Sequence, residues 1–196
     1  IKKLEPGHLF TYSQDKFVSE PYWKPVVKHI CPSEPEALDR LDHLLRESVR
    51  RRLVADVPVG VFLSGGLDSS IIAAIANEYS PNITAYTIQA HSSYDESAFA
   101  RRVAHHCGLT HVVSRLTDDD ILCAVHAISE HLDEPLADYS LVPTYLLCKL
   151  ARKNETVALG GDGADELFAG YGTFKAAYAA PMMARVPPLM GRWFRG

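Results

Sequence analysis

The residues from Leu63 to Ser70 are of the types that hold phosphate groups. The stretch reads Leu-Ser-Gly-Gly-Leu-Asp-Ser-Ser and follows an apolar run that begins at Val59. Paired glycines can adopt positive φ and let backbone N–H groups converge on an anion, and the serines add hydroxyl donors. The isoleucines that follow predict a helix whose positive N-terminus faces the same loop. The stretch is therefore a candidate phosphate cradle.

This loop lacks the lysine of the commoner phosphate loop and carries an aspartate, Asp68. Gly60 and Gly65 have the spacing of a Walker A loop, but Gly66 and Leu67 occupy the places of its Lys and its Ser or Thr. The carboxylate of Asp68 would repel nucleotide phosphates unless a metal ion lay between them, which implies a hard divalent cation such as Mg²⁺. The alternative interpretation is a plain glycine turn with Asp68 in the first turn of a helix.

A second glycine-rich stretch, residues 160–171, also follows an apolar run. It begins Gly-Gly-Asp-Gly-Ala-Asp-Glu, and it is not a dinucleotide fingerprint because Glu166 stands where the third glycine should be. Asp165 and Glu166 alone could be charges that stabilise a helix N-terminus. Together with the first loop, a flexible backbone carrying three carboxylates favours a shared ligand site.

Strands and helices alternate along most of the chain. Strands are predicted at 59–63, 83–89, 111–115 and 156–159, and helices from Ser33 to near Asp56, from Ser70 to Ser80, from about Asp95, from a cap at Thr117 and over 141–153. The N-terminal 30 residues read as short strands and turns. The order predicts an α/β fold, a parallel sheet with flanking helices that binds its ligand beyond the carboxyl ends of the strands.

The string Ser-Gly-Gly-Leu-Asp-Ser resembles the PP-loop of the N-type ATP pyrophosphatases, which cleave ATP between the α and β phosphates. With the second glycine-rich stretch, the chain resembles the asparagine synthase family over nearly its whole length. Lys3 to His8 and Tyr22-Trp23 resemble the end of the glutaminase domain in glutamine-dependent asparagine synthetases. The resemblance implies an adenine-nucleotide α-hydrolase-like fold and a cytoplasmic amidotransferase of asparagine biosynthesis, with ATP and Mg²⁺ as cofactors.

The resemblance also assigns roles to individual residues. The pyrophosphate end of ATP would be held by the first loop, that is by Ser64, Gly65, Gly66, Asp68, Ser69 and Ser70. Asp68 and Asp165 would bind Mg²⁺. The main chain at Leu63 and Ile88 would meet the adenine, and Gly160 and Gly161 would contact the nucleotide. Asp162 stands where many members have a glutamate proposed as a base. Further acidic positions match the family pattern with roles left open: Asp95, Glu96, Asp133, Glu134 and Asp138.

Two departures from the family pattern concern the acceptor substrate. Gly160 replaces a usual serine, and Asp162 is one methylene shorter than glutamate. The implied reaction is adenylation of a carboxylate, aspartate by resemblance, followed by transfer of ammonia from glutamine to give asparagine, AMP and pyrophosphate. The alternatives are a related amidotransferase or β-lactam-forming synthetase acting on another carboxylate, and a nucleotide-binding fragment without activity.

Composition and organisation set the outer limits. The 196 residues are 47% hydrophobic with a formal charge of −4 and no basic stripe, so small-molecule substrates are expected rather than nucleic acid. No apolar run approaches the ~20 residues that span a bilayer, and the four cysteines form no C-x-x-C pair. We expect 1–32 to be the tail of an upstream glutaminase-like domain and linker, and 33–196 a C-terminally incomplete synthetase domain, inactive when isolated. A homodimer is left open.

Overall fold

The computed structural model describes residues 3–26, 32–89 and 95–183. The chain divides into two compact units, Ile1–Leu41 and Asp42–Gly196, and the boundary lies inside helix α1 (Glu34–Arg52). Cys31, one of the four cysteines, lies outside the described residues.

The first unit contains the β-hairpin of β1 (His8–Ser13) and β2 (Lys16–Pro21). Gln14 and Asp15 join the strands with φ values of 49° and 58°, the left-handed conformation that a two-residue hairpin turn requires. Phe10 and Phe17 stack across the strands with their ring centroids 5.3 Å apart. The predicted short N-terminal strands are confirmed.

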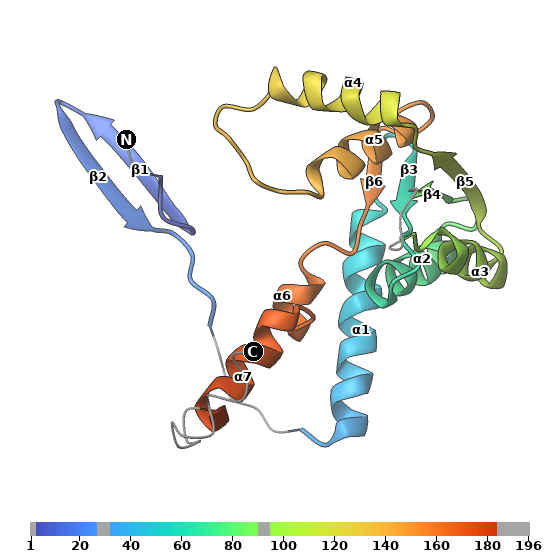
Figure 1. Cartoon of the computed structure of the whole chain (residues 1–196). Helices are drawn as coiled ribbons and strands as arrows, with labels where there is room; N and C mark the ends of the chain where they lie inside the picture. The colour runs from blue at the N-terminus through green and yellow to red at the C-terminus, as the bar shows by residue number, and fades with distance from the viewer. Residues whose placement is uncertain (1–2, 27–31, 90–94, 184–196) are drawn as a thin grey trace. The chain divides into compact units, whose positions relative to one another are not determined.

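The second unit is built on a four-stranded sheet in the order β5-β4-β3-β6. Its strands are β3 (Val59–Phe62), β4 (Thr84–Gln89), β5 (Thr110–Arg115) and β6 (Val157–Leu159), and every neighbouring pair is parallel. The predicted α/β class and all four predicted strands are confirmed, with ends that differ by one residue. β3, the first of these strands in the chain, lies between β4 and β6, so the chain leaves it in one direction and later returns to its other side (Figure 1).

Helices cover both faces of the sheet. α1, α2 (Leu67–Tyr79) and α3 (Ser97–Cys107) share a core with Val61 and Ala85, while α4 (Asp118–Ser129) and α5 (Leu141–Ala151) pack with Ile88 in a second core. Ala85 and Ile88 point to opposite faces of β4, because side chains alternate along a strand. The chain continues into α6 (Ala164–Phe168) and α7 (Gly172–Met183). Helix α2 begins three residues before the predicted start at Ser70, and α1 ends at Arg52 rather than near Asp56.

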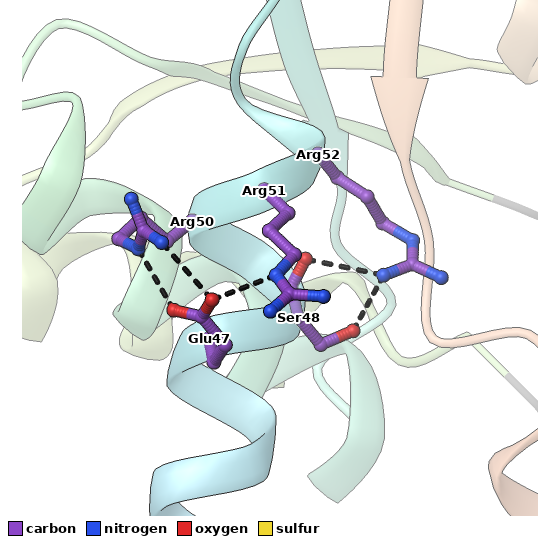
Figure 2. Close-up of polar contacts among 5 residues, drawn as sticks. All are labelled: Glu47, Ser48, Arg50, Arg51 and Arg52. Atoms are coloured by element: carbon purple, nitrogen blue, oxygen red, sulfur yellow. Dashed lines mark hydrogen bonds and ion pairs between the residues drawn. The ribbon is translucent and has the colours of Figure 1, made fainter.

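The arginines in the last turn of α1 are exposed, as expected for the solvated face of a helix. Arg50 and Arg51 pair with Glu47 at 2.9 and 2.7 Å, and Arg52 donates to the carbonyl and hydroxyl oxygens of Ser48 (Figure 2). Hydrogen bonds from Arg50 and Arg51 lower the pKa of Glu47 to about 2. The basic run is thus partly balanced within its own helix. Among the described helices, none has the length and apolar character needed to cross a membrane.

Candidate functional site

The two glycine-rich loops meet at one edge of the sheet. Val61 pairs with Leu159, so the chain leaves β3 and β6 side by side at their carboxyl ends. A Cβ built on Gly161 would lie 3.0 Å from the main-chain nitrogen of Ser69 and 3.1 Å from the Cβ of Asp68. The second loop therefore packs directly on the first turn of α2. This edge is also where the strand order reverses, the usual ligand position in open α/β sheets.

Gly65 shapes the first loop. Its φ is +91°, and a Cβ there would lie 2.5 Å from the nitrogen of Ala100 and 2.7 Å from the Cβ of Phe99. Glycine is needed both for the backbone conformation and for the close approach of α3. Gly66 differs from the expectation that both glycines use positive φ, because it is the N-cap of α2 with φ −68° and ψ 164°. An extended N-cap residue does not require glycine for its backbone.

Serine hydroxyls hold the first loop in shape. The N–H of Ser64 donates to the Oγ of Ser69 at 3.2 Å, and the two hydroxyls lie 2.9 Å apart. The N–H of Gly66 donates to the Oγ of Ser64 at 3.2 Å. Ser70 directs both its N–H (3.1 Å) and its hydroxyl (2.6 Å) to the carbonyl of Gly66. In this conformation the hydroxyls of Ser64 and Ser69 bond to each other and to main-chain N–H groups of the loop, whereas the donors of Ser70 serve the helix.

Three carboxylates of the predicted site lie in or beside these loops. Asp68 is half-buried in the first turn of α2, and its Cβ lies next to Gly161. Asp165 is half-buried, and its carboxylate occupies the space that a side chain at Gly170 would need. Asp162 is exposed, and its carboxylate lies beside Gly160 in the same way. The carboxylate of Asp162 therefore lies toward the start of the second glycine-rich stretch, and that of Asp165 lies toward its end.

The donor chemistry at this edge suits magnesium. No group of three or more His, Cys, Asp or Glu side chains that could hold a metal occurs within the described residues. Mg²⁺ usually takes one or two carboxylates and completes its shell with phosphate oxygens and water. The half-buried carboxylates in or beside the two loops are those of Asp68 and Asp165. Desolvation, and then the carboxylate of Asp162, raise the pKa of the Cys148 thiol on α5.

Leu63 and Ile88, whose main chain is predicted to meet the adenine, are held in place by hydrogen bonds of the sheet. The N–H of Leu63 donates to the carbonyl of Tyr86 at 2.9 Å, and the carbonyl of Leu63 accepts from the hydroxyl of Thr87 at 2.5 Å. Main-chain groups of alternate residues in a parallel strand face the same neighbour, so Ile88, two residues after Tyr86, faces the side where β3 has turned into the loop. Thr87 is not among the predicted site residues, and the sequence gives no signal that separates it from Thr84 in the same strand.

The other acidic positions mostly begin helices. Asp95 accepts from the N–H and hydroxyl of Ser97, and Asp138 does the same with Ser140. These bonds lower the pKa of both carboxyls. Thr117 caps a helix, as predicted: Thr117 and Asp120 form a reciprocal capping box on α4. Glu96, Asp133 and Glu134 are exposed.

A groove of about 950 Å³ lies between α2 and α3. Its lining includes Gly65 and Ser70, but the rest comes from side chains such as Phe99, Arg102 and His106, with no residue of the second loop. The edge where the two loops meet is the better candidate, because it combines backbone donors with carboxylates.

The sequence model of the asparagine synthase family matches residues 40–194. The chain belongs to this family. It is 33% identical over 189 residues to asparagine synthetase [glutamine-hydrolyzing] 1 of Bacillus subtilis, covering 95% of this chain and 30% of that protein. It is 38% identical over 138 residues to a putative asparagine synthetase of Mycobacterium bovis, covering 70% of this chain and 21% of that protein. The chain thus spans less than a third of these two relatives.

A solved structure supports the fold. Glutamine-dependent NAD⁺ synthetase from Acinetobacter baumannii, in complex with ADP, matches with a TM-score of 0.50 and 23% identity. The match covers 74% of this chain and 29% of that one. The likeness agrees with the observed parallel sheet and its flanking helices.

Proposed function

We propose that this chain is the nucleotide-binding part of an ATP-dependent, amide-forming synthetase that adenylates a carboxylate, aspartate in the first instance. The observation that carries the proposal is the contact between Gly161 and the first turn of α2, which brings the two glycine loops to one sheet edge. Membership of the asparagine synthase family supports it.

The first loop is proposed to hold the β and γ phosphates of ATP. Its amide groups and the N-terminus of α2 offer positive partial charge, and the loop contains no lysine. The groups proposed to approach the phosphates are those of Ser64, Gly65, Gly66 and Ser69. Gly160 and Gly161 would contact the nucleotide from the second loop, and the main chain near Leu63 and Ile88 would border the adenine.

Asp68 and Asp165 would hold Mg²⁺, which when bound neutralises charge on the departing pyrophosphate. The protein's own contribution is to align the α-phosphorus with the substrate carboxylate. An oxygen of that carboxylate forms a bond to the α-phosphorus, and the bond from phosphorus to the bridging oxygen of pyrophosphate breaks. Ammonia then bonds to the acyl carbon, AMP leaves with the electron pair, and the surplus proton of the amine must be removed.

Asp162 is proposed to take part in this second step. It is exposed in the second loop and lies beside Gly160, away from the position of Asp165. A general base must come within about 2.6–3.2 Å of the proton it removes. A glycine at position 160 leaves room for the shorter aspartate side chain to lie across the loop.

The experiment is ATP–pyrophosphate exchange with the native protein and a panel of carboxylates, followed by detection of the amide after ammonia is added. We expect exchange that depends on a carboxylate, with aspartate the most active. Exchange with a different carboxylate would support the related amidotransferase or β-lactam-forming alternatives. ATP binding without exchange for any carboxylate tested would contradict the proposed reaction.

A further inference from the structure

A threonine and a histidine outside both loops are hydrogen-bonded to the start of the first loop. Thr87 of β4 is 3% exposed, and its hydroxyl donates to the carbonyl of Leu63 at 2.5 Å. The Nε2 of His111, on β5, lies 2.7 Å from the same hydroxyl oxygen. Position 111 pairs with Ala85, so both side chains lie on the face of the sheet that α3 covers.

The direction of these hydrogen bonds follows from their proton count. A carbonyl oxygen can only accept, so the single hydroxyl proton of Thr87 is directed to Leu63. The Nε2 of His111 must then carry a proton and donate it to the hydroxyl. Neutral His111 meets this requirement as the Nε2–H tautomer. The order His111 to Thr87 to Leu63 is therefore fixed by geometry.

Other contacts keep His111 in that neutral form. Burial and the nearby guanidinium of Arg101 lower the pKa of His111. Arg101 is itself held by hydrogen bonds to Gln89 and Ser97 at 3.0 and 3.1 Å. The neutral state of His111 is thus supported from α3 and from the end of β4.

The carbonyl of Leu63 belongs to the first peptide unit of the phosphate loop. In a trans peptide the carbonyl and the following N–H point in opposite directions. The N–H of this unit, on Ser64, donates to the Oγ of Ser69 at 3.2 Å. Both ends of the unit are therefore bonded, one to Thr87 and the other to the first turn of α2.

We propose that Thr87 and His111 are positioning residues that fix the plane of the Leu63–Ser64 peptide and so preorganise the phosphate loop. The proposal rests on the proposed function for its catalytic consequence, and on the hydrogen bonds alone for its structural one. Preorganised donors stabilise developing charge because they need no rearrangement during the reaction. Neither residue touches the nucleotide in this account.

The test combines amide hydrogen exchange with ATP–pyrophosphate exchange in the native protein. Thr87→Val keeps the side-chain shape and removes the hydroxyl, and His111→Phe removes the donor. Each should accelerate amide exchange at Leu63 and Ser64 and lower kcat by about tenfold, less than the loss of a direct oxyanion donor. Thr87→Ser keeps the hydroxyl, so it should retain most of the wild-type protection from amide exchange and most of the wild-type kcat.

The double variant is the decisive comparison. If His111 acts through Thr87, Thr87→Val with His111→Phe should be no worse than the worse single variant. Thr110→Val is the matched control, since it makes the same substitution at the exposed amino end of β5 and should change neither measurement. Additive losses, or a Thr87→Ser variant as impaired as Thr87→Val, would overturn the proposal.

The two measurements also separate this proposal from the proposed function. A wild-type protein that lacks pyrophosphate exchange would refute the reaction, while the amide exchange of Leu63 and Ser64 would still decide whether Thr87 and His111 order the loop. Unchanged amide exchange in Thr87→Val would refute the positioning role whatever the activity.

Discussion

Gly161→Ala tests the contact between the two loops. The added methyl would lie 3.0 Å from the nitrogen of Ser69 and 3.2 Å from the carbonyl carbon of Asp68, closer than nearly all real Cβ contacts. Both neighbours are main-chain atoms in the first turn of α2, which cannot swing aside as a side chain would. The loops must therefore separate by a few tenths of an ångström.

The cost of this separation can be estimated for folding and for catalysis. Overpacking by a methyl group typically costs about 1–3 kcal/mol, and a shift this small places the expected loss near 1 kcal/mol. That corresponds to a fall of about 2–4 °C in the melting temperature of a domain this size. A misplacement of about 1 Å can cost about 100-fold in rate, so a few tenths predicts a loss of about three- to tenfold.

The assay is ATP–pyrophosphate exchange beside thermal unfolding. Gly172→Ala is the matched control, because a Cβ at Gly172 meets nothing within 4 Å, and it should leave both measurements near the wild-type values. If Gly161→Ala lost stability as expected but kept the full exchange rate, the loops would not share a site. An equal loss of rate in the control would show that the effect is not local.

Three further predictions follow from the site and its supports. Asp68→Asn should lower pyrophosphate exchange by about 100-fold or more through loss of a metal ligand, while the free energy of unfolding changes by less than about 1 kcal/mol; full exchange activity would refute the metal assignment. Asp165→Asn should weaken ATP binding, whereas Asp162→Asn should spare it and depress amide formation, and equal affinities for ATP would remove that distinction. Thr117→Ala should lower the free energy of unfolding by about 1 kcal/mol near pH 7 in urea. Hydrogen bonds from Thr117 hold the pKa of Asp120 below its usual value, so its stabilisation is present above about pH 4 and is lost as the pH falls through the lowered pKa. A loss from Thr117→Ala that did not shrink over that range would contradict the hydrogen bond from the Thr117 hydroxyl to the Asp120 carboxylate.

Local features of the fold could be predicted because neighbouring residues decide them. The apolar run after Pro58, the paired glycines and the cap at Thr117 each carry their own signal in a few residues. The sequence predicts that α2 starts at Ser70, three residues later than its observed start at Leu67. The helix begins there because Gly66 adopts the extended N-cap conformation, a backbone choice that the sequence left open.

Long-range features of the site could not be read from the sequence. Nothing in the spacing of residues 59–62 and 157–159 states that β6 pairs with β3 rather than with β5, yet this pairing brings the loops together. The hydrogen bond from Thr87 to Leu63 likewise depends on register between strands. The sequence shows that Ser70 carries a hydroxyl, but whether this hydroxyl donates a hydrogen bond to the carbonyl of Gly66 depends on where α2 begins.

The most direct test of the shared nucleotide site is amide hydrogen exchange in the native protein with and without Mg-ATP. We predict that ATP slows exchange in both loops, residues 63–70 and 160–163, and that Gly161→Ala weakens the protection of both together. Protection of the first loop alone, or protection confined to the α2–α3 groove around Phe99 and Arg102, would contradict the claim that the two glycine loops form one ATP site.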